Sequence, residues 1–286
     1  MATAAGTSID KSLSGKPDPR KGVVGTIDRW IYVFMAVLFL VTVLVGFIPD
    51  SIAKLAAIQA GKRPPFPPIL HVHAALILHV HAALMGCWLL LLLTQTTLMA
   101  TGHRALHRKL GVIGMVLAPA IVVAGFLLVP TMYGMTWSAL QAAPSGSEAE
   151  VELRRMLGAK TNIALVQIRI GILFAVFVTL GLLARRRDAG IHKRLMILAT
   201  AIPIPAATDR MLWLPSTLPA NPLTVDLYPL LLIAPMFFWD LYRTRHVHRA
   251  YLIWLGVSLP FVVALHLLWG SAWWAATVPG LMGVPA

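Results

Sequence analysis

Long apolar stretches recur along the chain and are separated by short polar segments. An α-helix needs about 20 predominantly apolar residues to cross the hydrocarbon core of a bilayer. The sequence therefore predicts an all-α fold, a polytopic transmembrane helix bundle with about seven spans, at 28–48, 69–100, 111–130, 161–184, 193–214, 226–243 and 250–272.

Proline interrupts the last three of these spans. Pro203 and Pro205 in the fifth predict a kinked or broken helix, because proline removes a backbone donor and clashes with the preceding turn. The sixth and seventh contain Pro229, Pro235 and Pro260, which membrane helices tolerate where neighbouring groups satisfy the freed carbonyl.

The segments outside the spans are polar or short. Residues 1–27 predict a disordered cytoplasmic tail, and 274–286 a short outer tail. In the long loop at 131–160, Ser145 followed by Glu148 resembles a capping box that opens a short surface helix.

Composition and charge support a membrane protein over a nucleic-acid binder. The chain is 58% hydrophobic and 12% charged, whereas soluble chains carry about 25% charge. The net charge of +13 comes from bases in short runs between apolar segments, which favours contact with anionic lipid headgroups. Sixteen bases fall on the side of the N-terminus and six on the other, so we expect a cytoplasmic N-terminus and an outer C-terminus.

The segment 69–84 is an eight-residue unit, ILHVHAAL, written twice. With both copies the second span is about 32 residues, or about 48 Å, so one copy exceeds what a crossing needs. His81 shares a helical stripe with Trp88 and Gln95 at intervals of seven, whereas His79 points away from it. His81 is therefore the candidate for a buried role, and His73 a possible substitute for it.

Polar side chains inside spans are costly in lipid and usually face the bundle interior. Arg169 and Asp209 form the expected ion pair. We expect an outward-facing polar pocket that binds a ligand, although separate interhelical hydrogen bonds would explain the same residues, which are His81, Trp88, Gln95, Gln167, Arg169, Asp209, Arg210 and His266.

A second pattern occurs at the cytoplasmic ends of the third, fifth and seventh spans, where a histidine precedes a base at a helix N-terminus. Such ends attract anions, so these residues could bind phosphate headgroups, or gather at the edge of a metal or haem. The cluster consists of His107, Arg108, His192, Lys193, His248 and Arg249.

These motifs resemble those of an uncharacterised group of bacterial seven-helix membrane proteins. The matching runs are HAALMGCWLLLLLTQTTLMATGHRALHRKLG, RRRDAGIHKRLMILAT and WDLYRTRHVHRAYLIWLG. The resemblance implies a multi-pass protein of the bacterial inner membrane, and it implies no particular chemistry.

Three functional classes remain open from the sequence. The first is a membrane protein that binds a small ligand or lipid without catalysis. The second is a b-type cytochrome-like redox protein, with haem b held by His81 and His266 at the outer side, or by two of the three cytoplasmic histidines. The third is a transporter of a small solute or of protons, which the proline-broken fifth span suggests.

Overall fold

The structure, a computed structural model, describes residues 22–61 and 72–285, and within those ranges it is helical without strands. Six of its helices are long and apolar enough to cross a membrane, as a multi-pass membrane protein requires. The helices are α1 (Val23–Gln59), α2 (Val72–Ala100), α3 (Arg104–Ala142), α4 (Glu148–Ala184), α5 (Ala189–Ala201), α6 (Pro205–Thr208), α7 (Leu223–Thr244), α8 (Arg249–Leu268) and α9 (Ala272–Leu281).

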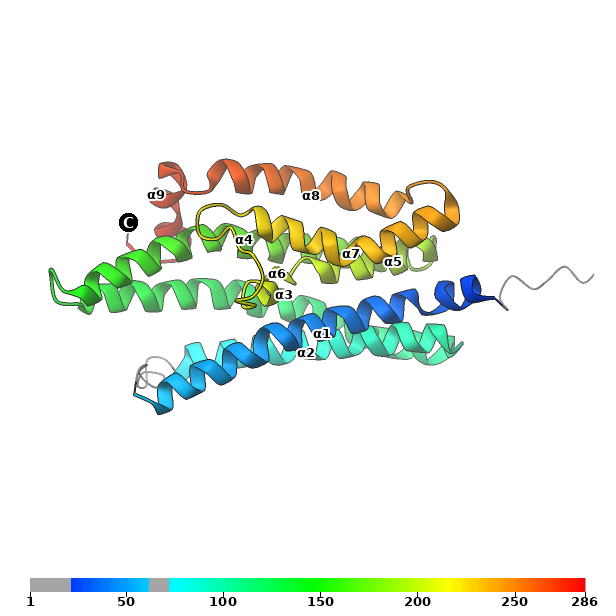
Figure 1. Cartoon of the computed structure of the whole chain (residues 1–286), viewed down its shortest axis with the longest axis horizontal. Helices are drawn as coiled ribbons and strands as arrows, with labels where there is room; N and C mark the ends of the chain where they lie inside the picture. Colours follow the sequence, from blue (N-terminus) through cyan, green and yellow to red (C-terminus); the bar gives the residue numbers. More distant parts are fainter. Residues whose placement is uncertain (1–21, 62–71, 286) are drawn as a thin grey trace, which may run out of the picture.

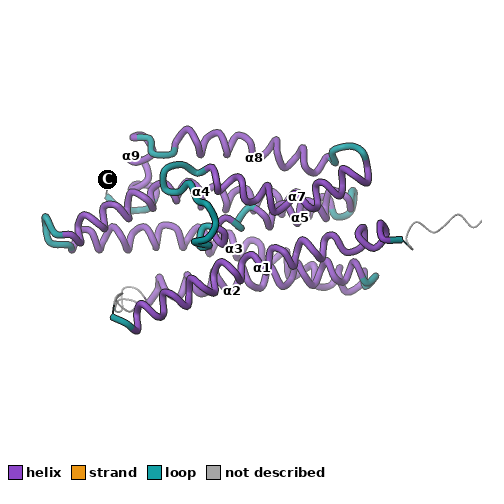
Figure 2. Tube along the Cα trace, viewed as in Figure 1, coloured by secondary structure: helices purple, strands orange, loops and turns teal. Residues whose placement is uncertain are grey.

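The long helices lie side by side along one axis, and the chain reverses direction at each connection (Figure 1). The start of α1 and the C-terminus lie at opposite ends of the bundle (Figure 1). We call the end that holds the start of α1 the N-terminal end and the other the opposite end. Figure 2 shows that loops gather at these two ends, except for the passage between α5 and α7.

This exception, which we call the fifth passage, consists of α5, α6 and the chain that leads from α6 to α7. Its helix is interrupted midway. Asp188 caps α5 by accepting a hydrogen bond from the Ile191 backbone N–H at 2.9 Å. The helix ends at Ala201, and a turn leads to the four-residue α6, which begins at Pro205. This confirms the predicted break, and irregular chain then runs on to the start of α7 (Figure 2).

The broken passage is enclosed by other helices. Residues of α5 such as Ile197, Ala199 and Thr200 are fully buried, and they pack in one core with Phe177 of α4. On the other side α1 approaches α6 at Gly46, where a Cβ atom would lie 2.8 Å from the carbonyl carbon of Ala207 and closer still to its oxygen. Glycine is thus required for this contact.

Several helices are longer than the sequence predicted. Helices α1, α3 and α4 have 37, 39 and 37 residues. The 29 described residues of α2 are therefore not excessive beside them, which removes the length argument against the first ILHVHAAL copy. Residues 62–71 lie outside the described ranges, and so does His71, the counterpart of His79 in the first copy.

The predicted ends of the chain need two corrections. Helix α1 begins at Val23, inside the segment predicted as a disordered tail, and the rest of that segment, 1–21, lies outside the described residues. The predicted outer tail contains α9, whose Trp274 is buried and donates its indole N–H to the Thr161 carbonyl at 2.7 Å. Helix α9, which is too short to span a bilayer, thus packs against α4.

The capping box lies two residues later than predicted. Ser147, not Ser145, is the N-cap and accepts from the Glu150 N–H at 3.1 Å, while the Glu150 carboxylate accepts from the Gly146 N–H at 2.7 Å. The helix that it opens continues into the fourth span as α4 rather than ending as a surface helix.

Replacing Gly46 by alanine should destabilise the protein, because the new methyl group must displace the backbone of α6. Overpacking typically costs about 1–3 kcal/mol, which for a chain of this size lowers Tm by roughly 5 °C. Gly86→Ala is the matched control, since a Cβ there meets no atom within 4 Å and alanine favours a helix. Equal melting temperatures for the two variants in detergent would contradict the close contact.

Candidate functional site

A cavity of about 140 Å³ lies between α2, α3, α4 and the break in the fifth passage. His81 and Gln167 supply the polar side chains of its wall, and Pro203 and Ala206 place the break itself in the wall. The remaining lining residues are Met85, Ile121, Val122, Gly125, Phe126, Leu128, Val129, Ile170, Gly171 and Phe174. An apolar cavity of about 150 Å³ holds benzene, so this space suits a small ligand.

His81 is the polar group of the cavity with an unsatisfied buried atom. Its Nδ1 is buried and has no hydrogen-bond partner among the described residues. Its ring packs on α3, where a Cβ at Gly125 would lie 3.4 Å from Cε1. By contrast, His79 is exposed and its Nδ1 lies 2.6 Å from the Ala75 carbonyl of its own helix. The side chain of His73 lies outside the described part of the structure.

The other two residues of the predicted stripe lie further along α2. Trp88 is 2% exposed and donates its indole N–H to the Thr200 hydroxyl at 3.0 Å, which ties α2 to α5. Gln95 is half-buried beside Gly111, and its amide oxygen has no hydrogen-bond partner among the described residues. Neither residue lines the cavity.

The predicted pair of Arg169 with Asp209 is wrong. Arg169, buried in α4, donates to Asp226 of α7 at 2.5 Å, and His266 of α8 contacts the other oxygen of the same carboxylate at 2.9 Å. Asp226 lies in the first turn of α7 and reaches the middle of α4, whereas Asp209 is exposed after α6. The three residues form a site separate from the cavity lining.

Arg210 also has a different partner from those expected. Its guanidinium lies 3.5 Å from the Asp50 carboxylate and 4.3 Å from the centre of the Phe47 ring, both on α1. These contacts hold the end of α6 against α1, beside the close approach at Gly46. Asp209 has no ion-pair partner among the described residues.

His81 and His266, the two ligands expected for an outer haem, do not share a site. His81 faces the cavity, whose volume suits benzene rather than a porphyrin, while His266 is engaged with Asp226. Within the described ranges, no group of three or more His, Cys, Asp or Glu residues is placed to hold a metal ion.

At the N-terminal end, two of the three predicted histidines meet. The ring centres of His107 and His192 lie 6.4 Å apart, and Nδ1 of His192 is 2.8 Å from the Gly181 carbonyl. His248 instead lies beside Gly190, where a Cβ would be 3.1 Å from its Nε2.

The helix ends at this side are partly occupied by protein groups. Asp188 caps α5, and the hydrogen bond from Ile191 lowers the pKa of its carboxyl. Nδ1 of His248 accepts from the Ala250 N–H and caps α8, while burial lowers the pKa of the His248 imidazole. An anion at the α5 or α8 terminus would therefore compete with a cap, whereas α3 has no side-chain cap.

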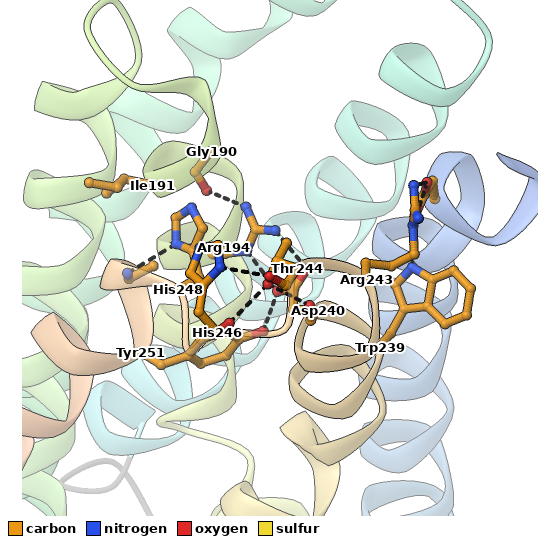
Figure 3. Close-up of polar contacts among 12 residues, drawn as sticks. Gly190, Ile191, Arg194, Trp239, Asp240, Arg243, Thr244, His246, His248 and Tyr251 are labelled. Carbon is orange, nitrogen blue, oxygen red and sulfur yellow. Dashed lines mark hydrogen bonds and ion pairs between the residues drawn. The ribbon is translucent and has the colours of Figure 1, made fainter. Parts of the chain in front are cut away.

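A buried ion pair, which sequence reasoning missed as a pair, joins α5, α7 and α8 near this end (Figure 3). Arg194 donates from two nitrogens to Asp240 at 2.7 and 2.6 Å, and the Tyr251 hydroxyl donates to the same carboxylate at 2.6 Å. Arg194 lies in the run RRRDAGIHKRLMILAT and Asp240 in the run WDLYRTRHVHRAYLIWLG, and both runs belong to the sequence resemblance, which was the available signal. Such a network is structural, because every oxygen is used by protein donors.

A second, more exposed contact fastens α1 to α7. Arg243 donates to both oxygens of Asp28, and the Trp239 indole donates to one of them at 2.9 Å. Arg243 and Trp239 lie close together in Figure 3. Lys193 lies 4.6 Å from the ring centre of Tyr32 on α1. Arg108 and Arg249, also in the predicted cluster, have no carboxylate partner within the described residues and are exposed.

Comparison of the chain with protein-family models, with curated protein sequences and with solved structures gave no match.

Asp226→Asn should destabilise the protein far more than Asp209→Asn. Removing one partner of a buried ion pair leaves the other charge unpaired and costs about 3 kcal/mol, whereas an exposed, unpaired carboxylate contributes within about 0.5 kcal/mol. Thermal unfolding of both variants in the same detergent measures the difference. Similar melting temperatures, or a larger loss for Asp209→Asn, would contradict the observed pairing.

Proposed function

We propose that the protein is a multi-pass protein of the bacterial inner membrane that binds a small uncharged ligand in the cavity at His81. The observation that carries this proposal is a benzene-sized space whose wall holds the His81 imidazole, which makes no hydrogen bond to a described residue. Nδ1 is covered by protein, so a ligand in the space reaches the imidazole at its other nitrogen, Nε2, and one such hydrogen bond contributes about 1 kcal/mol. Ligand sites are typically apolar cavities with a few polar groups of this kind.

The arrangement of charged groups supports a cytoplasmic N-terminus, and the broken passage supports a seventh crossing. At the opposite end, Lys54, Arg154, Arg155 and Arg210 each contact a carboxylate. At the N-terminal end, only Arg194 and Arg243 among the described bases do so. Unpaired bases favour the cytoplasmic side and anionic lipid headgroups. The chain begins the broken passage at the N-terminal end with α5 and then turns back into α7 (Figure 1), and we count this passage as the seventh crossing.

Transport is the second candidate, and the break favours it. Secondary transporters bind substrates near the middle of the bundle, against helices that are discontinuous there. Pro203 and Ala206 put such a discontinuity in the cavity wall. In a protein that binds its ligand without transport, the same break would only shape the wall of the cavity and would not move.

A cavity-filling substitution should abolish binding of a small apolar probe. Fluorobenzene, followed by ligand-observed ¹⁹F NMR in detergent, should bind the native protein and Val123→Phe, whose side chain is 59% exposed on α3. It should not bind Val122→Phe, because Val122 lines the cavity and the larger ring occupies it. Equal signals from both variants would show that the probe only partitions into the micelle, and the proposal would fail.

Thiol labelling from the two sides of the membrane separates the two candidates. In a Cys87→Ser background, Gln167→Cys places a thiol on an exposed position of the cavity wall. An N-terminal tag should be protected from added protease in intact spheroplasts. If the protein only binds its ligand, the thiol should react with a membrane-impermeant maleimide from outside only. A transporter should react from outside in spheroplasts and also from inside in inverted vesicles. An accessible tag would contradict the proposed orientation.

A further inference from the structure

Among the described residues, no charged side chain lines the cavity wall. Of these lining residues only His81 and Gln167 are polar, and Arg169, two residues from Gln167, is bonded to Asp226 outside the lining. An ionised ligand would enter this space without a countercharge, at a cost of several kcal/mol. The lining therefore selects an uncharged molecule.

Two aromatic rings border the space. Phe174 of α4 is held by Trp88, with ring centres 5.1 Å apart in an edge-to-face arrangement. Phe126 of α3 is 42% exposed, and a Cβ at Gly171 would be 2.9 Å from its ring. Aromatic rings in the wall favour a flat, aromatic occupant, because aromatic pairs gain energy beyond the area that they bury.

The polar groups define what the occupant carries. The accessible nitrogen of the His81 imidazole, Nε2, donates or accepts according to the tautomer, and the Gln167 amide does both. A hydroxyl group, which also donates and accepts, matches either group, and one hydroxyl on a ring of benzene's size stays within about 140 Å³.

We infer that the ligand class of this cavity is a neutral, single-ring aromatic with one hydroxyl group, a phenol, held by His81 and Gln167 between Phe126 and Phe174. The inference rests on the proposed ligand-binding function and adds the chemistry of the ligand. The hydroxyl hydrogen-bonds to the imidazole, and the ring packs on the two phenylalanines.

Three fluorinated probes of similar size test this chemistry by ¹⁹F NMR titration in detergent: 4-fluorophenol, fluorobenzene and 4-fluorobenzoate. The native protein should bind 4-fluorophenol about tenfold more tightly than fluorobenzene, since one hydrogen bond to a buried group is worth about that factor. It should not bind 4-fluorobenzoate. His81→Leu should remove the preference for the phenol and retain fluorobenzene, and Gln167→Leu should reduce the preference. The matched control His79→Leu, at an exposed position, should keep native affinities for all three.

The outcomes separate this inference from the function on which it rests. Fluorobenzene binding without a preference for the phenol, or an unchanged preference in both His81→Leu and Gln167→Leu, overturns the assigned ligand class and leaves an apolar binding cavity. Tight binding of the benzoate overturns it as well. Failure of every probe to bind the correctly folded native protein overturns the proposed function itself. Melting curves of each variant establish folding, and Gln167→Leu decides the case if His81→Leu does not fold.

Discussion

The need to hydrogen-bond every backbone group inside a membrane constrains this fold more than any other interaction. A helix meets that need by itself, but a broken helix meets it only where protein encloses the break. In the fifth passage, short turns replace the α-helical bonds, as in the contact of the Ile204 N–H with the Ala201 carbonyl at 3.2 Å. Pro205 has no N–H to satisfy, and its position at the start of α6 suits its fixed backbone angle.

Enclosure of that break explains the position of the neighbouring helices. Helix α1 comes close enough at Gly46 to cover the carbonyl of Ala207, and Arg210 binds back to Asp50 on the same helix. Helix α4 covers α5 on another side with large apolar side chains such as Phe177. Where α2 and α3 complete the enclosure, packing is incomplete and the cavity at His81 remains. The cavity is thus a consequence of how the break is covered.

The buried ion pairs serve a separate purpose from the cavity. Arg194 with Asp240 joins α5 to α7 near the N-terminal end, and Arg169 with Asp226 joins α4 to α7 further along the bundle. Each places a carboxylate of α7 against a base of another helix. Together they fix the position of α7 beside the broken passage, which contributes no long helix of its own for α7 to pack against.

The sequence predicted the helical class, most span positions and the break, because apolar run length and proline act locally. It also selected His81 over His79, and the two differ in the structure as one cavity-facing and one exposed side chain. It assigned the wrong acid to Arg169, since both Asp209 and Asp226 lie near span ends and only packing decides which one reaches α4. The α9 helix was missed because its burial against α4 depends on the chain's return at Gly270 rather than on a span-length apolar run.

The central claim is that a small aromatic ligand occupies the space between His81, Gln167 and Phe174. Crystals grown with 4-bromophenol and measured at the bromine absorption edge test it most directly, because anomalous scattering locates the bromine independently of the protein. The account predicts one anomalous peak inside this cavity, with the phenol oxygen within hydrogen-bond distance of the His81 imidazole. A well-ordered protein with an empty cavity, or with bromine only at the lipid-facing surface, would contradict it.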